Sequence, residues 1–144
     1  MKAEKTIWVL GHKVSMMKPS GDYDMVIGET PAGVSGPPPH YHEEFSELFF
    51  VLEGTMEFMV DGDIVKVKEG ATVDLPPKSL HTFKNASEDQ CRWVNIHSPK
   101  GFLSFFKDMG IPAEEDEAME KSVNQSIIKK VIERAADYDM HFNN

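Results

Sequence analysis

Residues 33–47 read Gly33-Val-Ser-Gly36-Pro-Pro-Pro-His40-Tyr-His42-Glu-Glu-Phe-Ser-Glu47. On an extended strand, side chains two positions apart point to the same face, so His40 and His42 are expected to point the same way. A carboxylate, Glu47, follows five residues later. Neutral imidazoles and carboxylates are the usual ligands of divalent transition metals, so this stretch predicts part of a metal site.

A second stretch supplies a further histidine: Gly70-Ala-Thr-Val-Asp-Leu-Pro76-Pro-Lys78-Ser-Leu-His81-Thr-Phe-Lys-Asn85. Three histidines and one glutamate around one ion would leave one or two coordination positions open. That arrangement is typical of a reactive or ligand-binding metal and not of a closed structural one. The predicted ligands are His40, His42, Glu47 and His81.

Around these stretches, the first hundred residues alternate between short β-prone runs and turns. Asp61-Gly62 is a strong hairpin signal, because Asp-Gly readily supplies the positive φ angles of a type I′ turn. The run 47–53 is almost wholly apolar after its first residue, which predicts a strand covered on both faces. Regularly spaced short strands favour an antiparallel sandwich or barrel. The expected strands are 7–10, 23–29, 47–53, 55–60, 64–67, 72–75, 81–84 and 92–97.

The two histidine stretches resemble the two motifs of the cupin superfamily, HxHxxxxE followed by six residues and Gly, then GxxxxxPxGxxHxxxN. The first motif is matched at His40, His42, Glu47 and Gly54, and the second at Gly70, Pro76, His81 and Asn85. Lys78 stands where the second motif has glycine. The resemblance, to small bacterial cupins of the quercetin dioxygenase-like group, implies an all-β fold. This would be a double-stranded β-helix (jelly-roll barrel) with the metal held inside, followed here by short C-terminal α-helices.

After residue 101 the apolar period becomes helical. Phe102, Phe105, Phe106 and Met109 would share one face of a short helix. Residues 113–120 are acidic and predict a solvated linker. A second helix follows, with Asn124 as its cap. We therefore expect a cupin barrel at residues 1–101 and a helical extension at 102–144, packed on the barrel or on a partner subunit.

Composition excludes several classes of function. The net charge is -9 and no basic run occurs, so binding to nucleic acid or to an anionic membrane is not expected. Cys91 is the only cysteine, which suits a reducing compartment, and we expect it to be a small packed side chain. The apolar stretch at residues 7–10 is too short for a signal core or a membrane span, so the expected location is cytoplasmic.

The parity of each strand predicts which side chains surround the metal. The predicted lining is mostly apolar and consists of Phe49, Val51, Phe58 or Met59, and Phe83. No lysine or arginine shares the parity of the ligands on their strands. His97 could line the pocket, but a structural role is favoured. His12 and His141 lie outside both motifs and receive no role. The predicted ligand is a small molecule with one or two metal-chelating oxygens, since a phosphate would need fixed cations.

Three functions remain open at this stage. The first is a dioxygenase-like oxidoreductase acting on a small enolisable or phenolic substrate chelated by a mononuclear metal. Fe, Mn, Ni, Zn and Cu are all candidates, and Glu47 would be either a ligand or the base that takes the substrate proton. The second is a non-redox metal cupin, an isomerase or a decarboxylase. The third is a non-enzymatic module that binds or senses a small ligand.

The sequence also predicts a homodimer. Leu48, Phe50 and Leu52 form a second apolar face on the strand that carries Glu47, and the C-terminal helices add further apolar stripes. Apolar surfaces of this size normally mark an interface, and the resemblance to cupins implies back-to-back dimers.

Overall fold

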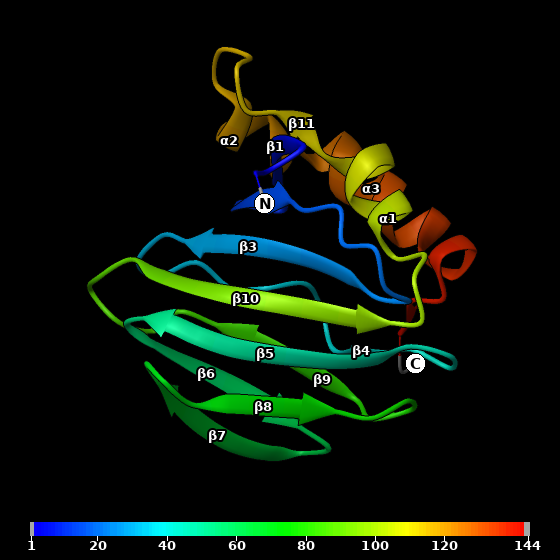
Figure 1. Cartoon of the computed structure of the whole chain (residues 1–144). Coiled ribbons are helices and arrows are strands. Elements are labelled where there is room, and N and C mark those ends of the chain that lie inside the picture. The colour runs from blue at the N-terminus through cyan, green and yellow to red at the C-terminus, as the bar shows by residue number, and fades with distance from the viewer. Residues whose placement is uncertain (1, 143–144) are drawn as a thin grey trace.

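The computed structural model describes residues 2–142, which form two antiparallel β-sheets packed face to face (Figure 1). The larger sheet has the order β11-β1-β2-β3-β10-β5-β8, and the smaller has the order β12-β4-β9-β6-β7. The all-β jelly-roll class expected from the sequence is confirmed. The strands are β1 (Lys5–Val9), β2 (His12–Met16), β3 (Asp24–Thr30), β4 (His40–Tyr41), β5 (Ser46–Glu53), β6 (Thr55–Val60), β7 (Asp63–Lys68), β8 (Thr72–Leu75), β9 (His81–Lys84), β10 (Cys91–Ser98), β11 (Ile111–Pro112) and β12 (His141–Phe142).

Two tight turns fix the register of their hairpins. Asp61 and Gly62 join β6 to β7 with positive φ angles of 48° and 91°, as the Asp-Gly signal predicts. Leu10 and Gly11 join β1 to β2 in the same way, with φ angles of 48° and 87°. The second hairpin was not expected, because leucine rarely adopts positive φ and gives no turn signal. Strand β2 is therefore missing from the sequence prediction.

The core lies between the two sheets, and alternation along each strand sends every second side chain into it. In β5, Phe49 and Val51 are buried, whereas Leu48 and Phe50 on the other side are only half-buried. Within one chain, β5 is therefore covered on one face only. One face lies inside the barrel, and the other lies on the outer surface of the larger sheet.

The segment after residue 101 packs against the β1 end of the larger sheet (Figure 1). It contains α1 (Leu103–Met109), α2 (Ala118–Ser122), α3 (Gln125–Arg134) and the 3-10 turn η1 (Ala135–Tyr138). The Asn124 side chain caps α3 by accepting from Ile127 N, as predicted. Residues 113–120 are not wholly a linker, because α2 begins within them.

This segment also adds a strand to each sheet, so it is built into the barrel. β11 pairs with β1, and β12 returns to pair with β4. Among residues 2–142, no helix is long and apolar enough to cross a membrane.

Candidate metal centre

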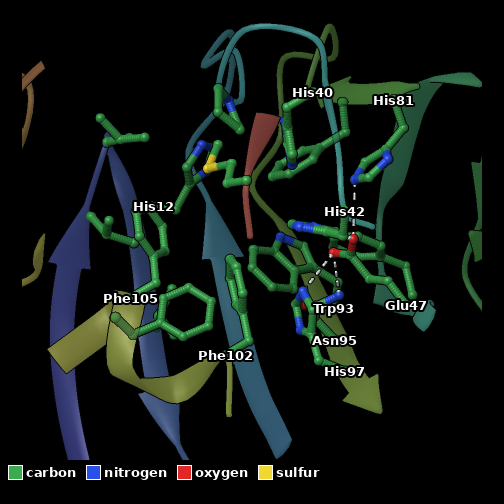
Figure 2. Close-up of a pocket in the computed structure, with 18 residues that line it drawn as sticks. His12, His40, His42, Glu47, His81, Trp93, Asn95, His97, Phe102 and Phe105 are labelled. Atoms are coloured by element: carbon green, nitrogen blue, oxygen red, sulfur yellow. Dashed lines mark hydrogen bonds and ion pairs between the residues drawn. The ribbon is translucent and has the colours of Figure 1, made fainter. Parts of the chain in front are cut away.

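Two cross-strand pairs face each other inside the barrel. His40 and His81 are opposite one another on β4 and β9 of the smaller sheet. Glu47 and His97 are opposite one another on β5 and β10 of the larger sheet. His42, just after β4, completes the cluster, and all five side chains are buried (Figure 2). The donor atoms form two triads, each within 4.8 Å: His40, His42 and His81, and His42, Glu47 and His97.

Backbone carbonyls fix the tautomer of the three motif histidines. Nδ1 of His40 lies 3.0 Å from the Pro38 carbonyl oxygen, Nδ1 of His42 lies 2.8 Å from that of Asp139, and Nδ1 of His81 lies 2.9 Å from that of Ser79. A carbonyl oxygen can only accept, so each Nδ1 carries the hydrogen. In the neutral rings Nε2 then presents a lone pair, which is the form that binds a metal.

Glu47 is held so that one carboxylate oxygen stays free. Oε1 accepts a hydrogen bond of 2.9 Å from Nδ2 of Asn95 and lies 3.4 Å from Nε2 of His97. Oε2 lies 3.0 Å from Nε2 of His81 and 3.3 Å from Nε2 of His42. These last two contacts are short, but neither has hydrogen-bond geometry. Oε2 therefore faces two imidazole nitrogens without a hydrogen bond to either.

Burial and mutual charge set the protonation states in the cluster. Burial lowers the pKa of His40 to about 3 and that of His97 to about 4, against partial opposition from Glu47. For Glu47 itself, burial favours the neutral acid, but His97, His42 and His81 outweigh it and hold the pKa well below its usual range. The Glu47 carboxylate is thus ionised beside neutral His40 and His97, and against the effect of burial it raises the pKa of His81.

This donor set fits a divalent transition metal. Nε2 of His42, His81 and His97 and Oε2 of Glu47 are all buried with no hydrogen-bond partner. Buried polar atoms without partners are costly, and several lone pairs converging on one point call for a cation. The four residues singled out by the sequence are therefore brought together, and the cluster could hold one metal ion.

His97 and Asn95 belong to this site although the sequence favoured a structural role for His97. Both lie on β10, where Trp93, Asn95 and His97 point into the barrel. His97 also stacks on Phe102, with ring centroids 4.1 Å apart. The signal that could have identified His97 is its place on the same face of the strand as Trp93 and Asn95. The pairing of β10 with β5, which brings it to Glu47, could not be predicted from the local sequence pattern.

The C-terminal strand closes the site from one side. We call residues Asp139, Met140, His141 and Phe142 the C-terminal clasp. The Asp139 carbonyl accepts from His42, and its carboxylate accepts backbone hydrogen bonds of 2.9 and 2.8 Å from Glu43 and Glu44. Burial would raise the pKa of Asp139, but these hydrogen bonds lower it below its usual value. The clasp thus orients a predicted metal ligand 97 residues away along the chain.

A cavity lined mainly by apolar and aromatic side chains runs from the cluster into the barrel. Phe49 and Phe83 line it as expected, but Val51 and Phe58 belong to the core and Met59 lies beside an outer groove, so those assignments are wrong. No lysine or arginine lines the cavity among the described residues. The lining residues are Val9, Leu10, His12, Val14, Pro37, His40, His42, Glu47, Phe49, His81, Phe83, Trp93, Asn95, His97, Phe102, Phe105, Phe106 and Met140.

The cavity is small. The volume open to the centres of water molecules is ≈ 60 Å³. This corresponds to roughly four to six waters, or about 120–180 Å³ of liquid. Such a space suits a one-ring compound better than a three-ring one.

Relatives of known structure share the fold. A cupin of the RmlC-like type from Shewanella frigidimarina has a TM-score of 0.59 and 23% identity, covering 67% of this chain and 86% of that one. KdgF from Halomonas sp. has a TM-score of 0.58 and 22% identity, covering 63% and 81%. A sugar phosphate isomerase from Silicibacter pomeroyi has a TM-score of 0.58 and 17% identity, covering 62% and 60%.

Sequence comparison points the same way. The chain is 31% identical over 94 residues to quercetin 2,3-dioxygenase of Bacillus subtilis, covering 65% of this chain but only 27% of that protein. It is 30% identical over 60 residues to polyketide synthase CurC of Streptomyces cyaneus, covering 42% of this chain and 39% of that protein. The matched part of the chain thus spans between about a quarter and two fifths of the length of these relatives. The cupin domain profile matches residues 26–97, half of the chain and the part that contributes all five clustered side chains. With the two-sheet barrel and both histidine motifs in place, the chain belongs to the cupin superfamily.

Proposed function

We propose that this cupin is a metal-dependent, dioxygenase-like oxidoreductase acting on a small phenolic or enolisable substrate. The observation that carries the proposal is the placement of the donor cluster at the head of a small aromatic cavity without cationic side chains. A mostly apolar pocket with a few convergent polar groups is the usual form of a small-molecule site. The similarity to quercetin 2,3-dioxygenase supports the reaction class.

Each clustered residue has a role in this scheme. His40, His42 and His81 would hold an Fe, Mn, Ni, Zn or Cu ion, and Glu47 would be either a fourth ligand or a base. The ion, when bound, supplies chelation and polarisation of two substrate oxygens. Glu47 is ionised and has a free Oε2, so it can accept the proton of a substrate hydroxyl. Asn95 holds the other carboxylate oxygen in place during that transfer.

The apolar lining also weighs against the isomerase alternative for phosphorylated sugars. A sugar phosphate needs fixed cations to replace water around its phosphate, and within residues 2–142 no lysine or arginine lines the cavity. The phenylalanine and tryptophan rings instead offer flat contact surfaces to an aromatic or planar enol substrate.

Oxygen uptake tests the proposal. The protein is loaded separately with each of the five metals and mixed with catechols, β-diketones, flavonols or sugar phosphates. A dioxygenase places both atoms of O2 in its product, so we expect one O2 consumed per substrate without added reductant. Catechols or β-diketones should react faster than flavonols because of the cavity volume.

A matched variant separates catalysis from background oxidation by the metal. Glu47→Gln should retain part of the metal and lose most of the uptake. Turnover without oxygen uptake would support an isomerase or decarboxylase instead. If every metal form binds one of these compounds but converts none of them, the protein is better described as a non-enzymatic ligand-binding module.

We further propose that the protein works as a homodimer in the cytoplasm. A reducing compartment suits Cys91, which is buried and whose pKa burial raises to about 11, so its thiol is unreactive.

A further inference from the structure

One polar atom in the cavity lies outside the donor cluster and has no partner. His12 is 3% exposed, and its Nε2 makes no hydrogen bond. Its neighbours in the cavity wall are Val9, Leu10 and Val14. Figure 2 shows His12 on the opposite side of the cavity from Glu47, with Trp93 and Phe102 drawn between them. An unpaired buried donor in an apolar wall calls for an explanation.

The neighbours of His12 fix its tautomer. Nδ1 lies 2.9 Å from Oγ1 of Thr30, and that hydroxyl also accepts a 2.9 Å hydrogen bond from Nε1 of Trp93. The hydroxyl hydrogen then needs an acceptor, and two lie nearby: Nδ1 of His12 and the sulfur of Cys91. The Ser35 backbone beside the ring favours a hydrogen on Nε2, so Nδ1 is assigned as the bare nitrogen. His12 lines the cavity, its Nδ1 edge is turned toward Thr30, and Nε2 on the other edge of the ring is buried without a hydrogen-bond partner.

His12 is also neutral. Burial lowers its pKa to about 4, and the nearby Ser35 backbone opposes this only in part, without reaching hydrogen-bond geometry with Nε2. A neutral N–H suits an uncharged oxygen here, such as a carbonyl or a phenol, because a neutral donor does not offset the cost of burying the charge of a phosphate or carboxylate.

The turn that carries His12 is strained and held in place. Leu10 has a φ of 48°, which costs a bulky residue energy, and the next amide, Gly11 N–H, donates a buried 3.0 Å hydrogen bond to Oγ of Ser122 in α2. Leu10 and His12 both line the cavity as a result. Strained backbone conformations of this kind persist only where the surrounding structure holds them, and they cluster at active and binding sites.

We infer that His12 is a specificity-determining residue, whose Nε2–H binds an uncharged oxygen of the substrate at the end of the cavity opposite the metal-chelating oxygens. The inference rests on the proposed function and narrows it. The substrate would be a small planar compound with a chelating pair of oxygens at one end and a second acceptor across the ring.

Two ligands that differ only in the distal group test this assignment. 4-Methylcatechol and 3,4-dihydroxybenzaldehyde share the chelating pair, and only the aldehyde has a distal carbonyl. Calorimetry on the zinc-loaded protein, where the metal does not oxidise the catechols, gives a dissociation constant for each. The ratio of the two constants is then compared between wild type and His12→Phe, which cancels the difference in chelating strength.

We expect the preference for the aldehyde to fall about 5- to 10-fold in His12→Phe, the size of one neutral hydrogen bond. His12→Gln keeps an N–H donor and should retain part of the preference. Lys13→Ala, on the same strand but half-exposed on the outer face, should match wild type. Metal content and circular dichroism confirm that each variant is folded and loaded.

Two results would overturn the assignment in different ways. An equal preference in wild type and His12→Phe, with both proteins loaded, would remove His12 from the substrate site and leave the proposed function intact. Failure of the wild-type protein to bind either catechol, together with no oxygen uptake on any phenol or diketone, would remove the proposed function and this assignment with it.

Discussion

At the scale of single residues, the four predicted ligands can be tested one at a time. His81→Ala removes one of three Nε2 lone pairs whose tautomer is fixed by backbone carbonyls. We expect metal affinity to fall by roughly 100-fold or more, beyond the 10- to 100-fold typical of outer-shell changes. Metal content after dialysis against a chelator measures it. Lys84→Ala, at an exposed position on the same strand, is the matched control. Unchanged metal content in His81→Ala would exclude this site.

Lys78 gives a second prediction at this scale. It stands where the cupin motif has glycine and has a φ of 73°, in the left-handed region that glycine tolerates. Its backbone N–H donates a 2.7 Å hydrogen bond to the carbonyl of His42, so the turn does contact a predicted ligand through the main chain.

Lys78→Gly should therefore raise the free energy of unfolding by up to about 1 kcal/mol, because relief of left-handed strain outweighs the added freedom of the unfolded chain. Urea denaturation measures the change. Lys78→Ala keeps the strain and should have little effect. A loss of stability in the glycine variant would show that this conformation costs lysine nothing here.

Residue patterns singled out four side chains that the structure brings together, because each motif carries its spacing locally. The same reasoning gave His97 a structural role and His12 no role. Both enter the cavity through tertiary pairing: His97 through the register of β10 with β5, and His12 through a strained Leu10-Gly11 turn. The strand that pairs with His97 is distant in sequence, and the Leu10-Gly11 turn, although adjacent to His12, gives no turn signal because leucine rarely adopts positive φ.

At the scale of elements, the C-terminal clasp carries a prediction of its own. Asp139→Ala removes the carboxylate that binds the backbone N–H groups of Glu43 and Glu44, beside His42. We expect metal affinity to fall about 10-fold or more, as for other residues that orient a ligand. Asp139→Asn keeps a hydrogen-bond acceptor, and asparagine tolerates the φ of 57° at this position. It should therefore lose less metal affinity than Asp139→Ala.

The neighbouring Asp137 provides the control. Its carboxylate is exposed and lies 3.5 Å from Arg134, away from the cluster. Asp137→Ala should bind metal as wild type does. Equal losses in the two alanine variants would mean that the clasp affects general stability and not the orientation of His42.

Among the elements, strands bounded by glycine, proline or Asp-Gly turns were predictable, as were α1 and the Asn124 cap of α3. Strands β11 and β12 were not. Each has two residues and exists only because a sheet edge accepts it. Their sequences have no β period of their own, so only the complete barrel defines them.

At the scale of the whole molecule, the outer face of the larger sheet bears on the dimer. Six apolar side chains lie half-buried on three adjacent strands, with Val94 opposite Ile27 and Phe50, and Ile96 opposite Met25 and Leu48. A continuous apolar sheet face of this kind is self-complementary under two-fold symmetry. We propose that a second copy of the chain covers it.

Light scattering should then give a mass of about twice 16.2 kDa at micromolar concentration. Ile96→Glu places a charge in the centre of this face and should yield monomers. Ile64→Glu changes a 61% exposed isoleucine on the smaller sheet and should leave the dimer intact. A wild-type monomer, or equal effects of both variants, would contradict this interface.

The clasp also has a consequence for the order of events during synthesis. Asp139 follows His97 by 42 residues, so at translation rates of 5–20 residues per second the five clustered side chains precede their clasp by about 2–8 s. In that interval the nascent barrel contains His42 without the carbonyl that orients it. Metal capture should therefore follow emergence of residue 139 from the ribosome. Ribosomes stalled at the point where residue 110 has just left the exit tunnel should carry chains that retain metal poorly, whereas full retention there would separate metal capture from the clasp.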